Sequence, residues 1–363
     1  MTSTSIFPAR YVQGAGAMKL LPEEVGRHGT KALAIVDKVV LTKVAPALKD
    51  KKVAIAVEPF GGECSDEEIE RLAAKVRKQQ ATVIVGVGGG KALDTAKAVA
   101  FATGHPVVVA PTLASTDAPC SALSVIYTPE GAFKRYLVLP KNPDVVLVDT
   151  KLIVEAPVRF LVSGMGDAMS TWFEAEDCKT KGAANMTGRP GTMTAYGLAR
   201  LCYDTLLKDG VAAKAACEKK TVTPEFERIV EANTLLSGLG FESGGLSGAH
   251  AIHDGLTALA GTHGYWHGEK VAIGTLALLM LTHRPAKVID EVYKFCAAIG
   301  LPTTLADIGI GKATDAELLQ AATKACAPED TMANVPGEVT PEKVAAALKA
   351  ADAEGKKRKA KAA

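Results

Sequence analysis

The chain has 363 residues and a formal net charge of +2, and its residues are 48% hydrophobic but only 5% aromatic. This length favours two domains with a large core, which Ala, Val and Leu must mostly fill. The near-neutral charge argues against nucleic acid or a membrane surface as a partner, and no uninterrupted apolar run approaches the roughly 20 residues of a membrane span. The seven cysteines are scattered and lack a C-x-x-C pair. They indicate reduced thiols, and we therefore expect a cytoplasmic protein.

Up to Pro157, short β-branched runs alternate with helical segments. Ser65 and Glu68 form a capping box at the start of one such helix. The alternation predicts right-handed crossovers and a parallel, Rossmann-like sheet. A hairpin is predicted for SALSVIYTPEGAFKRYLVLP, where two strand-like runs flank TPEG. The runs that read as buried strands are KALAIVD, KVAIAV, ATVIVGVG, HPVVVAP and PDVVLVD.

After Pro157 the β-branched runs stop and the apolar residues follow a helical period. We therefore predict an α/β N-terminal domain over residues 1–157 and an all-α C-terminal domain over residues 158–363. A cleft between two domains is the usual place for a ligand. The basic tail EGKKRKAKAA lacks apolar periodicity and is predicted to be a frayed, solvated end.

The segment GVGGGKALDTAKA links a predicted strand to a predicted helix. Gly88, Gly89 and Gly90 have no Cβ, so their backbone N–H groups can approach a phosphate, and the helix N-terminus favours an anion. Lys91 can add a positive charge. The loop is not a Walker motif, because Ala92 stands where a magnesium-binding hydroxyl would follow the lysine. The pattern predicts a pyrophosphate site, with a tight turn as the alternative.

Two acidic residues stand at the carboxyl ends of predicted strands. Asp37 ends the first strand, where a carboxylate can accept hydrogen bonds from ribose hydroxyls and would repel a 2′-phosphate. Asp117 lies in the hydroxyl-rich loop PTLASTDAPCS, which suits a cofactor or a polyol. The alternative for Asp37 is an exposed turn, and the alternative for Asp117 is a turn residue that only caps the loop.

Four of the seven histidines fall between Phe241 and Lys270. His250 and His253 are three residues apart, which places them on one face of a helix, and His267 follows. Imidazole is the commonest metal ligand near neutral pH, and two histidines with one remote carboxylate commonly hold a catalytic metal. Ordinary surface or interface histidines are the alternative.

Five motifs, in this order, resemble the iron-containing (group III) alcohol dehydrogenase superfamily and, within it, the glycerol dehydrogenases: GVGGGKALDTAKA, PTLASTDAPCSALSVIY, GMGDAMSTWFEAE, GLSGAHAIHDG and HGEKVAIGTLA. They cover nearly the whole chain. The resemblance implies that Asp167, His250 and His267 bind a catalytic zinc ion and that Asp117 lies beside the polyol. It also implies NAD contacts from Asp37, Gly90, Lys91, Thr112, Ser115, Ser121, Leu123 and Tyr127, to which we add Gly88, Gly89 and Asp94.

The activity implied is NAD-dependent oxidation of the secondary hydroxyl of glycerol, and of related vicinal diols, by hydride transfer from a zinc-bound alkoxide. His253 is a candidate proton carrier, with a packing role as the alternative. Asp254 and Trp266 stand where the family often has asparagine and tyrosine, which bears on substrate preference. We also expect a homo-oligomer.

Three other functions are open. A glycerol-1-phosphate dehydrogenase would need cationic residues near the substrate, and only Lys270 stands near the metal motifs. A 3-dehydroquinate synthase would need grouped Lys and Arg for a phosphate and a carboxylate. A metal- or nucleotide-binding protein without turnover is the third.

Overall fold

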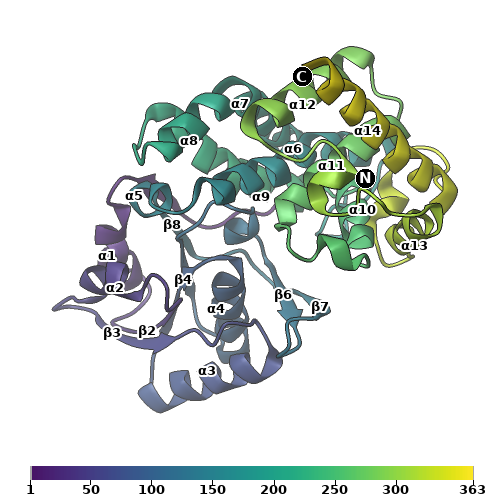
Figure 1. The fold of residues 1–363 in the computed structure, drawn as a ribbon. Helices are drawn as coiled ribbons and strands as arrows, with labels where there is room; N and C mark the ends of the chain where they lie inside the picture. Colours follow the sequence, from purple (N-terminus) through teal and green to yellow (C-terminus); the bar gives the residue numbers. More distant parts are fainter. Residues whose placement is uncertain (1, 363) are drawn as a thin grey trace. The chain divides into compact units, whose positions relative to one another are not determined.

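The computed structural model describes residues 2–362 and divides them into two compact units (Figure 1). The sheet unit comprises Ile6–Val158 and Ala216–Gly238. The helical unit comprises the chain start up to Ser5, Arg159–Ala215 and the chain from Leu239 onward. The division expected from the sequence, between residues 157 and 158, differs from these units in three places, one of which is Val158, a residue of the sheet unit. The segment 216–238 belongs to the sheet unit, and the first residues belong to the helical unit.

The sheet unit is built on six parallel strands in the order β1-β8-β5-β4-β2-β3. The five predicted strands are confirmed. The strand β1 was not predicted, because its four residues, YVQG, are only partly buried and contain no apolar run. The bounds are β1 (Tyr11–Gly14), β2 (Lys31–Val36), β3 (Ala54–Pro59), β4 (Val83–Gly88), β5 (Val107–Pro111) and β8 (Val145–Asp149).

Both faces of the central strands are buried, which explains their continuous apolar runs. One face packs against η1 (Ala17–Leu20), α1 (Leu21–Gly26), α2 (Leu41–Val44) and η2 (Ala45–Leu48). The helix α4 (Gly90–Thr103) lies on the other face, with α3 (Asp66–Gln79) beside it (Figure 1). A Cβ on Gly86 of β4 would lie 2.5 Å from the Cβ of Ala96, so a glycine there lets α4 approach the sheet closely.

The predicted hairpin is confirmed as β6 (Leu123–Tyr127) and β7 (Phe133–Val138), which form a separate two-stranded antiparallel sheet. Asp66, at the first position of α3, forms ion pairs with Lys134 (2.8 Å) and Arg135 (2.7 Å) of β7. The remaining elements of the sheet unit are η3 (Ala118–Cys120), α5 (Thr150–Val154), α8 (Pro224–Glu231) and a π-helical turn, η4 (Ala232–Leu236).

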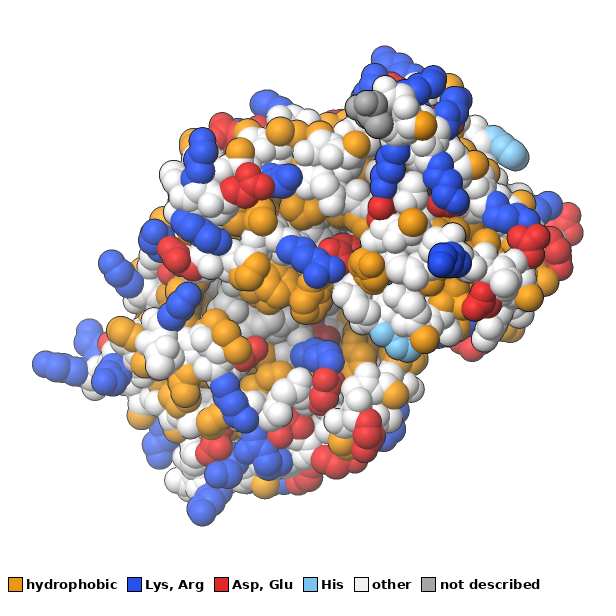
Figure 2. Space-filling view, viewed as in Figure 1, with side chains coloured by type: hydrophobic (Ala, Val, Ile, Leu, Met, Phe, Trp, Pro, Cys, Tyr) orange, Lys and Arg blue, Asp and Glu red, His pale blue; other side chains and the backbone are white. Residues whose placement is uncertain are grey.

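The described part of the helical unit contains no strand, in agreement with the predicted all-α second half. None of its helices, nor any other in residues 2–362, is long and apolar enough to cross a membrane. On the face in Figure 2, basic side chains are interspersed with acidic ones, in keeping with the net charge of +2. The elements are α6 (Val158–Lys181), α7 (Met193–Glu218), α9 (Ser237–Gly244), α10 (Gly248–Leu256), η5 (Ala260–Thr262), α11 (His267–Leu281), α12 (Ala286–Ile299), η6 (Leu305–Ile308), α13 (Asp315–Ala325), η7 (Thr331–Asn334) and α14 (Pro341–Ala362).

The prediction of a frayed basic tail is wrong. The helix α14 continues to Ala362, and the Arg358 guanidinium forms ion pairs with Asp290 and Glu354, each at 2.8 Å. Lys359 pairs with Asp307 at 2.6 Å. Two of these acidic partners lie far away in the sequence and the third lies one turn earlier on α14. The composition of the tail alone therefore does not predict these ion pairs.

Candidate active site

Two glycines bring α6 and the start of α11 into backbone contact. A Cβ on Gly268 would lie 1.8 Å from the carbonyl oxygen of Ser163, and one on Gly166 would lie 2.4 Å from the carbonyl oxygen of Gly268. Only residues without a side chain permit this approach. Gly166 precedes Asp167 and Gly268 follows His267, so this backbone contact places Asp167 beside His267.

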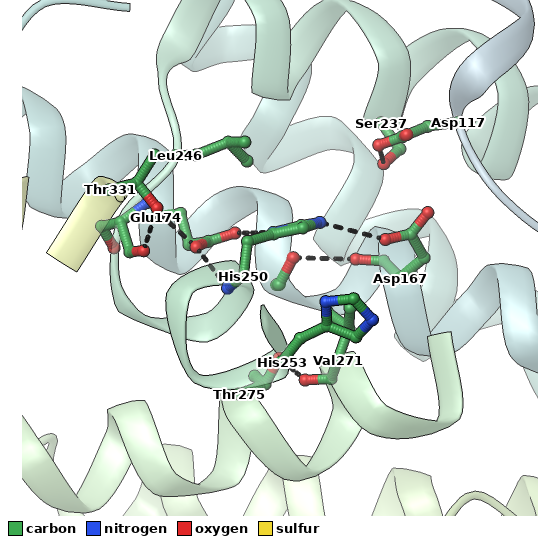
Figure 3. Close-up of polar contacts among 12 residues, drawn as sticks. Asp117, Asp167, Glu174, Ser237, Leu246, His250, His253, Val271, Thr275 and Thr331 are labelled. Atoms are coloured by element: carbon green, nitrogen blue, oxygen red, sulfur yellow. Dashed lines mark hydrogen bonds and ion pairs between the residues drawn. The ribbon is translucent and has the colours of Figure 1, made fainter. Parts of the chain in front are cut away.

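Asp167, His250 and His267 form a cluster in which the candidate ligand atoms all lie within 4.8 Å of one another. The Nε2 atom of His250 is 3.3 Å from Oδ1 of Asp167, and Nε2 of His267 is 3.2 Å from the same oxygen. Figure 3 shows the His250 ring directed at Asp167. The structure therefore brings together the three residues expected to bind a metal, all within the helical unit.

Glu174 fixes the orientation of His250. Its Oε2 lies 2.6 Å from Nδ1 of His250, and its Oε1 accepts hydrogen bonds from the backbone N–H groups of Ser247 (2.9 Å) and His250 (3.0 Å) (Figure 3). When a metal displaces the Nε2 proton, the hydrogen kept on Nδ1 by Glu174 would leave the Nε2 lone pair available to the metal. Glu174 was not among the residues predicted from the sequence. Its signal was the spacing from Asp167, because seven residues make two turns and place both on one helix face.

The electrostatics of the cluster suit a cation. Burial alone would raise the pKa of Asp167, but the adjacent His267 and His250 hold it well below its usual range. Burial alone would lower the pKa of His250, but Glu174 and Asp167 raise it well above the ordinary value of 6.5. One buried carboxylate oxygen and two imidazole nitrogens are a donor set that fits Zn²⁺ or Fe²⁺.

His253 lies beside this cluster rather than in it. Its ring packs edge-on against His267 with centroids 4.3 Å apart, and its Nδ1 is 2.9 Å from Oδ1 of Asp254. Burial and the neighbouring His267 lower the pKa of His253 to about 3, which keeps the ring neutral near pH 7. Trp266, the other departure from the family pattern, packs against Phe160 with ring centroids 4.9 Å apart.

In the sheet unit, Gly88, Gly89 and Gly90 join β4 to α4 as predicted. A Cβ on Gly88 would lie 2.8 Å from the Cβ of Ala92 and 2.9 Å from that of Asp37, so this glycine is required for packing. A Cβ on Gly90 would meet nothing closer than 3.8 Å. The space above the helix N-terminus is therefore open at Gly90, and Asp37 adjoins the same loop.

Two charged residues expected to contact the cofactor have protein partners. The Lys91 ammonium lies 2.5 and 2.7 Å from the carboxylate oxygens of Glu63 and 4.7 Å from the centre of the Tyr127 ring. Asp94 is buried, pairs with Lys97 at 2.9 Å and accepts a hydrogen bond from the Val125 N–H at 3.0 Å. The Asp94 carboxylate is therefore held by protein groups, and its contact with the cofactor stays a prediction.

The loop after β5 holds the other expected binding residues. The Thr112 N–H donates to the Gly88 carbonyl at 2.9 Å, which ties this loop to the glycine loop. Asp117 is largely buried, and its Oδ2 accepts a hydrogen bond from the Ser237 hydroxyl at 2.8 Å. Its side chain does not cap η3. The loop also contains Ser115, Ser121 and, where it enters β6, Leu123.

Comparisons with known proteins show which proteins the chain resembles. Residues 8–150 match the family described as iron-containing alcohol dehydrogenase. A glycerol dehydrogenase of Thermotoga maritima is 61% identical over 99% of both chains. One of Escherichia coli O6:H1 is 50% identical over 96% of both chains. A solved structure of a probable glycerol dehydrogenase from Sinorhizobium meliloti superimposes with a TM-score of 0.93 at 46% identity, covering 98% of this chain and 99% of that one.

Proposed function

The chain belongs to the iron-containing alcohol dehydrogenase family, an oxidoreductase family that uses NAD and a metal, and on this premise we propose that it oxidises glycerol at the secondary hydroxyl to dihydroxyacetone. Related vicinal diols are substrates of the same kind. The observation that carries the proposal is the convergence of Asp167, His250 and His267 in a chain that aligns from end to end with glycerol dehydrogenases.

Asp167, His250 and His267 would hold the metal, for which we propose zinc. A divalent ion bound there supplies positive charge that lowers the pKa of a substrate hydroxyl. Glu174 holds His250 in the tautomer whose Nε2 lone pair faces the cluster. His253 is neutral and oriented by Asp254 through Nδ1, and we propose that its Nε2 passes the released proton on toward water, because a ring with so low a pKa cannot retain the proton.

The cofactor residues proposed lie in the sheet unit. Gly88–Gly90 and the N-terminus of α4 bind the pyrophosphate through backbone N–H groups. Asp37 accepts hydrogen bonds from the ribose and opposes a 2′-phosphate, which favours NAD over NADP. Asp117 accepts a hydrogen bond from the polyol. The other proposed NAD contacts are Lys91, Thr112, Ser115, Ser121, Leu123 and Tyr127.

The test is NADH formation by the zinc-loaded protein with glycerol, propane-1,2-diol, butane-2,3-diol and glycerol phosphate, repeated with NADP. We expect turnover with glycerol and the vicinal diols and a preference for NAD. His267→Ala is the control variant, and it should lose turnover while NAD binding is retained. Turnover with glycerol phosphate alone would favour glycerol-1-phosphate dehydrogenase, and no turnover with any alcohol would contradict the proposal. The cytoplasmic location and the homo-oligomer stay predictions.

A further inference from the structure

Lys97 is a lysine of the sheet unit whose side chain is 1% exposed. Its ammonium lies 3.0 Å from the carbonyl oxygen of Ala118 and 3.3 Å from that of Ser121, and it also donates to the carbonyl of Leu123. The Ser121 hydroxyl is 3.5 Å away, and Asp94 pairs with the ammonium at 2.9 Å. Lysine is almost never fully buried unless it is paired, because desolvation of the ammonium is costly. The surrounding oxygens therefore compensate for the loss of hydration of this ammonium.

The segment that Lys97 holds is the loop between β5 and β6. Within this segment only η3 is helical, so no strand pairing or long helix fixes the position of the loop. Side chains take that role. The amide of Asn142 donates to the Cys120 carbonyl at 2.9 Å, and the amide of Asn233 donates to the Ala114 carbonyl at 2.9 Å. Buried carbonyls need such partners, so these side chains determine where the loop lies.

Lys97 also belongs to the helix that begins at the glycine loop. It lies seven residues after Gly90, two helical turns along α4 and on the same face. One rigid helix therefore connects the proposed pyrophosphate site to the loop that carries Asp117, Ser121 and Leu123.

We propose that Lys97 is a positioning residue, whose buried ammonium sets the loop Thr112–Leu123 at a fixed place relative to the glycine loop and so pre-forms the NAD site. The inference rests on the proposed function for the identity of the cofactor. Lys97 itself contacts only the protein. Its effect on NAD passes through the loop, because a small displacement of binding groups is enough to lose a well-oriented ligand.

The test replaces Lys97 with methionine, which has similar length and no charge, and measures NAD affinity by calorimetry without any alcohol. We expect NAD to bind about 10- to 100-fold more weakly, with zinc content unchanged, since the metal residues lie in the other unit. Lys75→Met is the matched control. That lysine lies in the same unit on α3, pairs with Glu58 at 3.1 Å and is 42% exposed, so its loss should leave NAD affinity unchanged.

Chemical rescue separates positioning by the charge from simple packing. Lys97→Ala removes the side chain, and added ethylammonium can supply a cation to the same oxygens, whereas ethanol, of similar size, cannot. We expect NAD affinity to recover with ethylammonium only. Recovery with both compounds or with neither would overturn the inference, as would wild-type NAD affinity in Lys97→Met.

If Lys97→Met does not fold, Asn142→Ala removes a neutral contact from the same loop and should weaken NAD binding with zinc retained. Unchanged NAD affinity there would also overturn the inference. A wild-type protein that binds no NAD would instead contradict the proposed function, so the two failures are distinguishable.

Discussion

Glu174 accepts three hydrogen bonds from one short segment of chain, two from backbone N–H groups and one from the imidazole of His250. A fully buried carboxylate with this many donors holds both the turn before α10 and the ring that α10 carries. Its contact within the cluster is with His250, so it acts on the metal through that ring.

We expect Glu174→Gln to lower zinc affinity by about 10- to 100-fold, because the amide cannot bind Nδ1–H as a carboxylate does and the histidine loses its fixed tautomer. A chelator competition titration measures this without any turnover. Glu176→Gln is the control, because Glu176 lies on the same helix and pairs with Arg284 rather than with His250. Equal zinc affinity in the two variants would contradict the role of Glu174 in orienting His250 for zinc binding.

Residue spacing made part of this site predictable. His250 and His253 share a helix, so their neighbourhood follows from a period that the sequence displays. Asp167 was expected only through the family resemblance, because no local pattern ties it to residues some eighty positions later. The sequence also does not reveal that Lys97, one turn along α4, pairs with the Asp94 carboxylate.

Among the elements, the valine-rich strands and the long amphipathic helices were predictable, since each displays its own period. The strand β1 and the π-helical turn η4 were not. β1 is stabilised by pairing with β8, which is more than a hundred residues distant, and the π-turn depends on contacts such as that of Asn233 with the Ala114 carbonyl. Both are set by tertiary partners rather than by local propensity.

Substitutions in the glycine loop should have different effects, because Gly88 and Gly90 have different surroundings. Gly90→Ala has room for the added methyl group and improves helix propensity, so the protein should stay folded. Its NAD affinity should fall about tenfold, equivalent to about 1.4 kcal/mol, because the methyl group stands where the pyrophosphate approaches. Calorimetry with NAD provides the measurement.

Gly88→Ala is the companion variant and should behave differently. Its Cβ would overlap Ala92 and Asp37, so it should lose about 1–3 kcal/mol of unfolding free energy. Thermal melts of both variants distinguish the two effects. Loss of stability in Gly90→Ala with normal NAD affinity would place the phosphate elsewhere.

For the molecule as a whole, metal binding should be coupled to both stability and pH. A ligand that binds only the folded state adds about 2.7 kcal/mol at a hundredfold excess over its Kd, so chelation should lower the melting temperature and zinc should restore it. Glu174 and Asp167 raise the pKa of His250, so without metal this ring keeps its proton at pH 7. Zinc must displace that proton, and its affinity should fall as the pH falls.

Calorimetric titrations with zinc in two buffers of different ionisation enthalpy count the protons released. We expect release near pH 7 and less release above the raised pKa of His250, where the ring is already neutral. His250→Ala is the control and should bind zinc weakly with no such release. Equal heats in the two buffers at pH 7 would contradict this coupling.

The division of the chain also dictates an order of events on the ribosome. Thr4 forms hydrogen bonds with Pro190 and Asn185, which are synthesised much later. The first residues can therefore take their place in the helical unit only after these partners have been made. The sheet unit is not complete at residue 158, because Asn233 and Ser237, which hold the loop after β5, have not yet been made. A nascent chain can therefore form the full proposed cofactor site only after residue 238 has emerged, and the metal cluster only after His267. Synthesis thus completes the sheet unit before it completes the metal cluster.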